Sequence, residues 1–181
     1  AEIKQSETHR ETFSVLLNIY CRNCGNHRIQ LGHQSYLLKQ LRVATKMLRQ
    51  ANDKQQRKEL LKSVLEGVNK QLEDVGVYQL PLDPRMCCTK VIVGECRVMS
   101  SKMAPLWLVF ENAFPHECDG KTKFTVLWKE GDDLRQDQLT LQLMGTMDIL
   151  WKTEGYDMNM VLYKCVSTGH MEGMLEIVEN A

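Results

Sequence analysis

Long apolar runs, a leader sequence and an excess of charge of either sign are all missing from this 181-residue sequence. No stretch reaches the roughly 18 apolar residues that a membrane-spanning helix needs. The first residues also lack the basic, apolar and small-residue order of a signal peptide. Lys and Arg number 23, as do Asp and Glu, so the basic footprint of a nucleic-acid-binding protein is absent. These absences predict a soluble, cytoplasmic protein that binds no nucleic acid.

Cysteine is present but not in the pattern of a disulfide framework. The 7 cysteines are odd in number and irregularly spaced, which favours reduced thiols in a chain with its own core. Cys21 and Cys24, followed by His27 and His33, nearly have the spacing of a zinc site. No second cysteine pair accompanies them, and Cys21 closes an apolar helix. We therefore interpret the cluster as packed side chains and predict no metal.

Charge is unevenly distributed despite the zero net charge. Residues 27–73 hold ten Lys/Arg against four Asp/Glu, whereas residues 111–181 hold six against thirteen. The basic stretch lies on predicted helices, which favours a solvated face, with contact to anionic lipid as the alternative.

Apolar residues at helical spacing predict three amphipathic helices in the first part of the chain. They span about residues 11–21, 34–50 and 54–73. Gly25 suits the end of the first helix, and Asn52-Asp53 is a plausible N-cap for the third. Two prolines in residues 79–84 then forbid a helix and mark a boundary.

Beyond this boundary the period changes to that of strands. Val, Trp, Phe and Thr gather in residues 89–98, 106–112 and 123–129, and the short connections favour antiparallel pairing. Residues 134–152 form a helical pattern, with an inner face expected at Leu139, Leu143, Met147 and Leu150/Trp151. Two short strands are expected after it, at residues 159–165 and 173–178.

The predicted order is a helical segment, three strands, one helix and two strands, without internal repeats. This order predicts an α+β fold, with an antiparallel sheet and one long helix packed on it.

A polar loop and one lysine occupy positions that suit a nucleotide triphosphate. The loop 99–105 can turn its amides, two serine hydroxyls and the Lys102 ammonium toward phosphate oxygens, and Lys129 on a strand adds a point charge. The acidic residues that follow Lys129 also suit a helix start, where they meet the positive end of its dipole. Asp133 and Asp137 share a face, so one of them can look back at Lys129. Spacing alone leaves a nucleotide site and an ordinary capped hairpin both open.

Longer motifs resemble the phosphoinositide 3-kinases. Residues 129–137, Lys-Glu-Gly-Asp-Asp-Leu-Arg-Gln-Asp, look like the Lys-x-Gly-Asp-Asp-Leu-Arg-Gln-Asp motif of phosphoinositide 3- and 4-kinases. Residues 99–107 resemble the phosphate-binding loop of class I 3-kinases. Residues 163–169 and 173–178 resemble the strand, loop and hinge approach of these enzymes. Residues 80–84 resemble the segment that leads into their catalytic domain. The resemblance is specific over residues 80–181 and covers residues 1–79 in helix pattern only.

The resemblance implies a fragment of a catalytic subunit, class I being favoured by Pro105-Leu106-Trp107. Residues 1–33 would end the helical accessory domain, and residues 34–181 would form a protein-kinase-like N-lobe that stops near the hinge. The start at Ala1 and the uncapped apolar end look like truncations. Lys164 departs from the glycine usual in class I, and Gln138 is closer to the class III pattern.

Carried over by position, the resemblance implies an ATP site. It assigns Met99, Ser101, Lys102, Trp107, Lys129, Asp132, Asp137, Tyr163, Glu176, Ile177 and Val178. Ser101 and Lys102 would meet phosphate, and Lys129 would hold the α-phosphate. Asp132, Asp137 and Tyr163 would line an inner pocket. Met99, Trp107 and Ile177 would form apolar walls, while Glu176 and Val178 would bind adenine through their backbones.

The implied activity is transfer of the ATP γ-phosphate to the 3-hydroxyl of a phosphoinositide headgroup. The catalytic loop and the metal-binding loop are not in this sequence, so no catalytic residue is named and the Mg²⁺ ligands are expected in a C-lobe. The implied partners are phosphatidylinositol lipids at the inner membrane surface and a regulatory or adaptor subunit. A helical interaction module and a catalytically inactive kinase relative are the alternatives.

Overall fold

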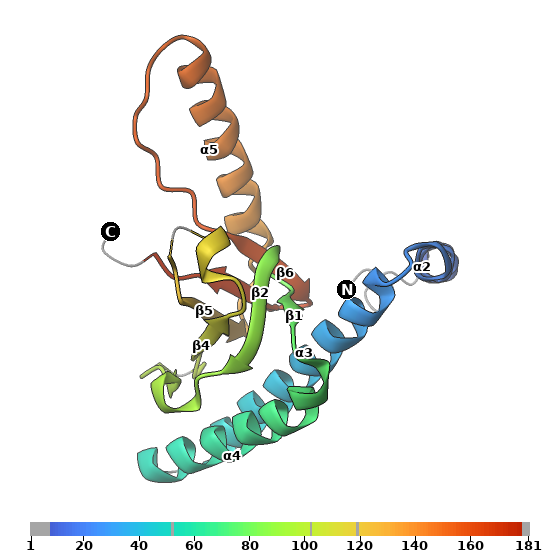
Figure 1. Cartoon of the computed structure of the whole chain (residues 1–181), viewed down its shortest axis with the longest axis vertical. Helices are drawn as coiled ribbons and strands as arrows, with labels where there is room; N and C mark the ends of the chain where they lie inside the picture. Colours follow the sequence, from blue (N-terminus) through green and yellow to red (C-terminus); the bar gives the residue numbers. More distant parts are fainter. Residues whose placement is uncertain (1–7, 52, 102, 119, 179–181) are drawn as a thin grey trace.

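The computed structural model describes residues 8–51, 53–101, 103–118 and 120–178. The structure confirms the α+β fold (Figure 1). Five strands, and not the expected three, precede the long helix, because a strand over residues 78–80 is added and the strand expected over residues 89–98 is divided. The elements are α2 (Arg10–Asn23), α3 (His27–Gln50), α4 (Lys54–Leu72), β1 (Tyr78–Leu80), β2 (Asp83–Val91), β3 (Arg97–Val98), β4 (Leu106–Asn112), β5 (Lys123–Glu130), α5 (Arg135–Thr153), β6 (Cys165–Gly169) and β7 (Glu172–Glu176).

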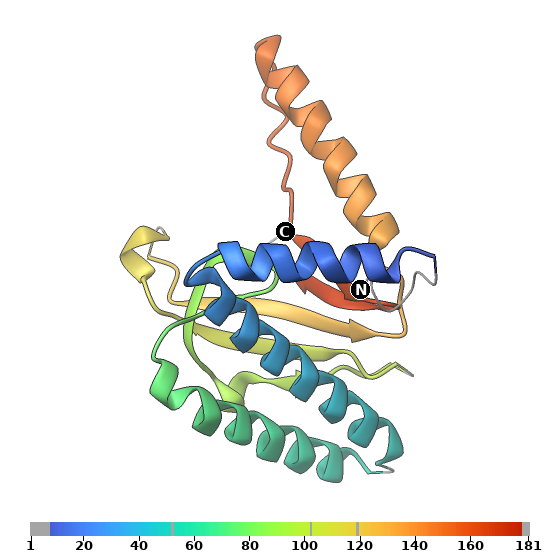
Figure 2. The same cartoon turned by 90° about the vertical axis from the view of Figure 1, so that its right-hand side faces the viewer.

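Helices α3 and α4 form a hairpin that packs on one face of the sheet (Figure 2). Its apolar stripe is almost fully buried, at Leu37, Leu41, Leu48, Leu61 and Leu65. The side chain of Asp53 accepts a hydrogen bond from the amide of Gln55 at 3.2 Å, which confirms this residue as the N-cap of α4. Asn52, the other half of the expected cap, lies outside the described residues.

Helix α3 begins at His27, earlier than the predicted start at residue 34. The domain boundary expected between residues 33 and 34 therefore falls inside one continuous helix. The nearest break lies at Gly25, whose φ of 55° belongs to the left-handed region that ends helices. The division into two domains stays a prediction, and this turn is the position that suits it.

The sheet has the order β1-β2-β4-β5-β7-β6, with β3 pairing β4, and the paired strands run antiparallel. The strand expected over residues 89–98 is divided, because the 3-10 turn Val93–Glu95 separates β2 from β3. The strand expected over residues 159–165 is wrong. Asn159 has a φ of 49°, which breaks an extended course, and the pairing begins only with β6.

Trp128 at the centre of β5 joins the sheet to the helical hairpin. Its side chain has no exposed area, and its Nε1–H donates to Oγ1 of Thr45 at 3.2 Å. The Thr45 hydroxyl donates in turn to the carbonyl of Leu41 at 2.9 Å, so both buried polar groups are satisfied. A second link joins Arg42 of α3 to Glu172 of β7, with Nε 2.7 Å from Oε2.

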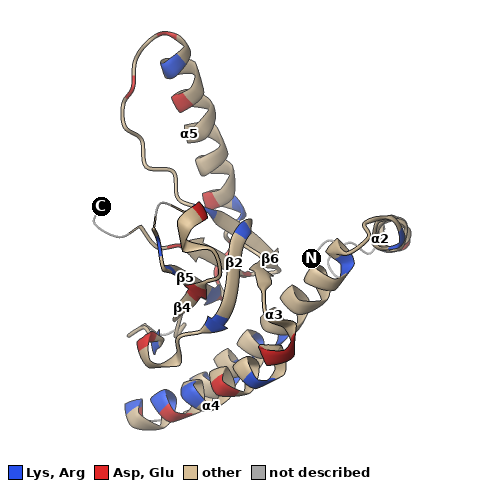
Figure 3. Cartoon of the chain, viewed as in Figure 1, with Lys and Arg blue, Asp and Glu red and all other residues tan. Residues whose placement is uncertain are grey.

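Helix α5 does not pack along the sheet as predicted. Its first turns contact β6, and the rest projects away from the sheet (Figure 1). The expected inner face is therefore exposed, with Leu139 and Leu143 each 58% accessible. The middle of α5 carries no charged residue (Figure 3). Within the described ranges, no helix is long and apolar enough to cross a membrane.

Candidate nucleotide-binding site

The cross-strand register sorts the side chains of β4, β5 and β7 onto two faces. Leu106, Trp128 and Met174 lie opposite one another, and Trp128 contacts α3. The neighbouring row, Trp107, Leu127 and Leu175, therefore lies on the face turned away from the helical hairpin, which we call the outer face.

Strand alternation places four of the sequence-predicted residues on this outer face. Lys129 follows Leu127 by two positions, and Ile177 follows Leu175 by two. The amide of Ile177 donates to the carbonyl of Thr125 at 3.0 Å, so the extended course continues past the end of β7. Arg97 pairs with Trp107, which puts Met99 on the same side as both. The structure thus brings together Met99, Trp107, Lys129 and Ile177.

Lys129 is held at the end of β5, opposite Gly173. Its Nζ lies 3.1 Å from Oδ2 of Asp132, and the lysine side chain remains 30% exposed. Asp132 is therefore the carboxylate that contacts Lys129, whereas the sequence suggested Asp133 or Asp137. The ammonium is oriented by a carboxylate and still open to an anion.

The carboxylate of Asp133 forms an ion pair with Arg135, two residues along the chain. The guanidinium donates to both carboxylate oxygens, at 2.8 and 2.7 Å, and the Arg135 amide donates at 3.2 Å. These hydrogen bonds lower the pKa of Asp133 to about 2. Asp133 therefore serves the turn that starts α5.

The 99–105 loop is held by its own hydrogen bonds. The amides of Met99, Ser101 and Ala104 donate to carbonyls of the loop at 2.8, 2.9 and 3.0 Å, and the amide of Met103 donates to the Ser101 hydroxyl at 3.2 Å. These amides are therefore engaged within the loop, and a phosphate contact from them stays a prediction. Ser101 is exposed and keeps a hydroxyl donor, while Lys102 lies outside the described residues.

Arg97 is a residue of the outer face that the sequence interpretation missed. Its guanidinium carbon lies 4.4 Å from the centre of the Trp107 ring, a cation–π distance. The signal was available, because Arg97 precedes Met99 by two positions in the sequence. The arrangement brings a positive charge next to the predicted apolar wall.

Asp137 and Tyr163 share one cavity of about 260 Å³ at the start of α5. Burial raises the pKa of the nearby Cys165 thiol, the charge of Asp137 raises it further, and the charge of Lys129 lowers it. Cys165 therefore lies within electrostatic reach of both charges. The cavity brings together two of the three residues expected to line an inner pocket, and Asp132 is not among its lining residues. The inner pocket stays a prediction.

The segment around Glu176 is fixed through both its backbone and its side chain. Its amide donates to the carbonyl of Lys164 at 2.8 Å, and its Oε2 accepts from the Lys164 amide at 3.2 Å. Oε1 lies 3.6 Å from Nζ of Lys121. Val178 is half-buried. Adenine binding by the backbones of Glu176 and Val178 stays a prediction.

Lys164, the departure from the class I pattern, forms an ion pair that the sequence did not reveal. Its ammonium contacts Oδ2 of Asp83, whose residue is only 8% exposed. Arg85 reaches the same oxygen at 2.9 Å. The pKa of Asp83 lies well below its ordinary value, because its hydrogen bonds to these cations outweigh the effect of burial. The pair ties the beginning of β2 to the segment before β6.

We expect Asp83→Asn to lower the free energy of unfolding by about 1–2 kcal/mol at pH 7. A carboxylate whose pKa is lowered by folding stabilises the native state above its ordinary pKa of about 3.9, and this stabilisation is lost as the pH falls. The gap between variant and wild type should therefore shrink below about pH 4. Thermal midpoints across pH would measure it, with exposed Asp74→Asn as the control. A gap of constant size down to pH 3 would contradict the assignment.

The side chains of Cys24 and His27 contact neighbouring groups at the end of α2. The thiol of Cys24 lies 3.7 Å from the carbonyl of Cys21, and the Tyr20 ring meets the His27 ring edge to face at 6.3 Å. No group of three or more His, Cys, Asp and Glu side chains in the described part of the chain is placed to hold a metal ion.

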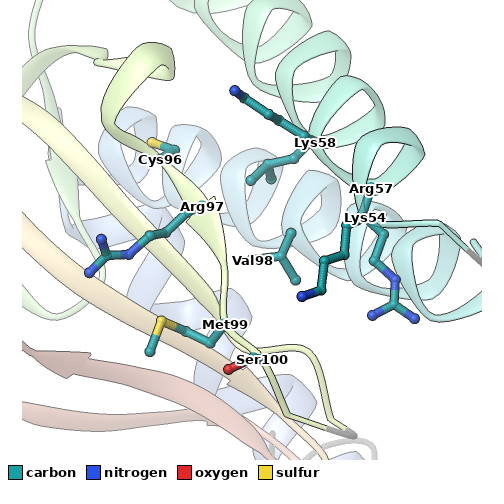
Figure 4. Close-up of a pocket in the computed structure, with 9 residues that line it drawn as sticks. Lys54, Arg57, Lys58, Cys96, Arg97, Val98, Met99 and Ser100 are labelled. Atoms are coloured by element: carbon teal, nitrogen blue, oxygen red, sulfur yellow. The ribbon is translucent and has the colours of Figure 1, made fainter.

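A cavity of about 310 Å³ lies behind β3, on the side of α4. Lys54, Arg57 and Lys58 line it, together with the strand and the start of the 99–105 loop. Figure 4 shows that the three charged groups point in different directions and that Arg97 turns away from α4. The cavity therefore has basic residues in its wall, but their charged groups do not converge on one point, as they would in an anion-binding site.

The sequence is similar to those of known lipid kinases. Residues 123–181 match the family described as phosphatidylinositol 3- and 4-kinase. The chain is 44% identical over 98% of its length to phosphatidylinositol 3-kinase 2 of Dictyostelium discoideum, and 37% identical over 94% to phosphatidylinositol 3-kinase 1 of the same organism. It spans only 9% and 10% of those two proteins. In residues 123–181, which carry Lys129 and the start of α5, the chain is thus similar to the phosphatidylinositol 3- and 4-kinase family, and the two relatives extend the similarity over nearly its whole length.

Proposed function

We propose that this chain is the ATP-binding part of a phosphatidylinositol 3-kinase, which transfers the γ-phosphate of ATP to the 3-hydroxyl of a phosphoinositide headgroup. The observation that carries the proposal is the outer face, where Lys129 lies on the same side of the sheet as Met99, Trp107 and Ile177. A planar base needs apolar walls, and a phosphate chain needs a fixed cation. The names of the two relatives support the choice of a 3-kinase.

The residues present fit a nucleotide. Lys129 is oriented by Asp132 and remains partly exposed, so its ammonium can meet a phosphate oxygen without moving far. The exposed Ser101 hydroxyl lies in the loop that leads into β4. Bound ATP would supply the phosphoryl group, and Mg²⁺ held by a C-lobe would neutralise its oxygens.

We extend the proposal to the setting of the whole protein. Its partners would be phosphatidylinositol lipids and a regulatory or adaptor subunit, and it would act in the cytoplasm after recruitment to the inner membrane surface. The residues before the turn at Gly25 would belong to the accessory helical domain. Class I remains the favoured subclass on the resemblance of the 99–107 segment.

The test is the position of the phosphate in the product. The full-length kinase that contains this sequence should transfer labelled phosphate from ATP to phosphatidylinositol vesicles, and the product should carry it at the 3-position. A 3-deoxy headgroup should accept none. Label at the 4-position would assign the protein to the 4-kinases, and absence of any transfer would contradict the proposal.

A helical interaction module is the second candidate, favoured by one observation on α2. Its apolar residues are about half exposed, with Val15 at 56% and Ile19 at 54%. An apolar row that the described residues leave half exposed suits contact with another protein. Binding of ATP would separate the two candidates, because the module would bind a subunit without nucleotide.

A further inference from the structure

Arg49, in the last turn of α3, contacts both the 99–105 loop and the end of β5. In the proposed function, these two segments bind the same phosphates. Its guanidinium donates to the carbonyl of Met103 in the 99–105 loop, at 3.2 Å from Nη2 and 3.4 Å from Nε. The same group donates to the carbonyl of Glu130, next to Lys129, and lies 3.8 Å from Oε1 of Glu130. One side chain therefore bridges the loop and the end of β5.

The loop and the strand end also touch directly. Gly131 has a φ of 96°, and a Cβ at this position would lie only 1.8 Å from Cε of Met103. The Gly131 amide donates to the carbonyl of Met171 in the β6–β7 turn at 2.5 Å. The turn after β5 is thus held between the 99–105 loop on one side and the β6–β7 hairpin on the other.

The loop needs such an anchor because its strand is short. β3 contributes two residues to the sheet, Arg97 and Val98. Few ladder hydrogen bonds therefore fix the beginning of the loop. Arginine suits a bridge of this kind, since its planar group presents five donors in a fixed arrangement, whereas lysine offers a compact point charge on a flexible stem.

We propose that Arg49 is a positioning residue for the nucleotide phosphates. By holding the Met103 and Glu130 carbonyls on one guanidinium, it sets the distance between Ser101 in the loop and Lys129 on the strand. This inference rests on the proposed ATP function. Arg49 lies outside every segment in which the sequence indicated a site residue, so the helical hairpin takes part in the nucleotide site as a support.

The test compares ligands with and without phosphates in the full-length kinase. Arg49→Gln should weaken the binding of ATP and ADP about tenfold, which corresponds to 1.4 kcal/mol, and leave the binding of adenosine unchanged. The KM for ATP should rise by a similar factor, with kcat at saturating ATP and the thermal midpoint little altered. Arg49→Lys should recover the affinity only in part, because a compact ammonium on a flexible stem lacks the fixed planar spread of donors that holds the two carbonyls. Lys46→Gln, an exposed cation one turn earlier on α3, is the matched control.

The possible results distinguish failure of the proposed ATP function from failure of the positioning role of Arg49. If the wild-type kinase binds neither ATP nor adenosine, the proposed function itself fails. If it binds ATP and Arg49→Gln binds ATP equally well, the function stands and the positioning role is wrong. If ATP and adenosine weaken together with a lower thermal midpoint, Arg49 is only structural, and the inference is overturned as well.

Discussion

Replacing Lys129 by Met should lower the turnover of the full-length kinase about a thousandfold or more and leave its thermal midpoint unchanged. The ammonium is fixed on β5 and oriented by Asp132 at 3.1 Å, so it meets a phosphate at little further entropic cost. Such a contact is worth several kcal/mol in the transition state, and each 1.4 kcal/mol is about tenfold in rate. Methionine keeps an apolar stem of similar length, so packing against the outer face survives.

Lys123 on the same strand provides the control. Its ammonium contacts Glu95, and the side chains are 44% and 46% exposed, so the pair contributes little to stability. Lys123→Met should therefore leave turnover and thermal midpoint nearly unchanged. Phosphoinositide product and thermal midpoint would be measured together for both variants. If Lys129→Met retained more than about a tenth of the activity, or lost activity only by unfolding, the phosphate role would be refuted.

Trp128→Ala should have the largest effect on stability, lowering the free energy of unfolding by about 3–5 kcal/mol. Trp128 has no exposed area and lies where β5 meets α3. Its removal leaves a cavity and takes the donor from the Thr45 hydroxyl. Because a multidomain kinase does not unfold in two states, hydrogen exchange of the β5 amides is the local measurement, and protection there should fall steeply.

Thr45→Val separates the hydrogen bond from the packing. This change keeps the side-chain volume but leaves the buried N–H of Trp128 without its acceptor, so it should cost about 1–3 kcal/mol, less than the loss of the ring. Equal losses for Thr45→Val and Trp128→Ala would show that the hydrogen bond, and not the buried ring, dominates this contact.

Local patterns in the sequence predicted most helices and strands, because hydrophobic periodicity and helix caps depend on residues that are close together in the chain. Asp53 and Gly25 mark helix ends in the structure as predicted. The alternation of Phe124, Val126 and Trp128 likewise located β5 and its buried face. The same alternation, once the register is known, gives the outer face with Lys129.

Contacts between distant segments were not predictable. The Asp83–Lys164 pair and the bridge made by Arg49 join residues far apart in the chain, and neither has a local pattern. The prediction that one face of α5 is buried was wrong for a related reason. Helical period shows that Leu139 and Leu143 share a stripe, but it does not show which element covers them, and none of the described residues does so.

The contact between Trp128 and Thr45 also sets an order of events on the ribosome. The two residues are 83 positions apart, and the helical hairpin that carries Thr45 is synthesised first. At 5–20 residues per second, its apolar stripe waits roughly 4 to 17 s for β5 to emerge. During that interval the stripe lacks the strand that covers it, so slow translation between α4 and β5 should lower the yield of folded protein without changing the stability of the molecules that fold.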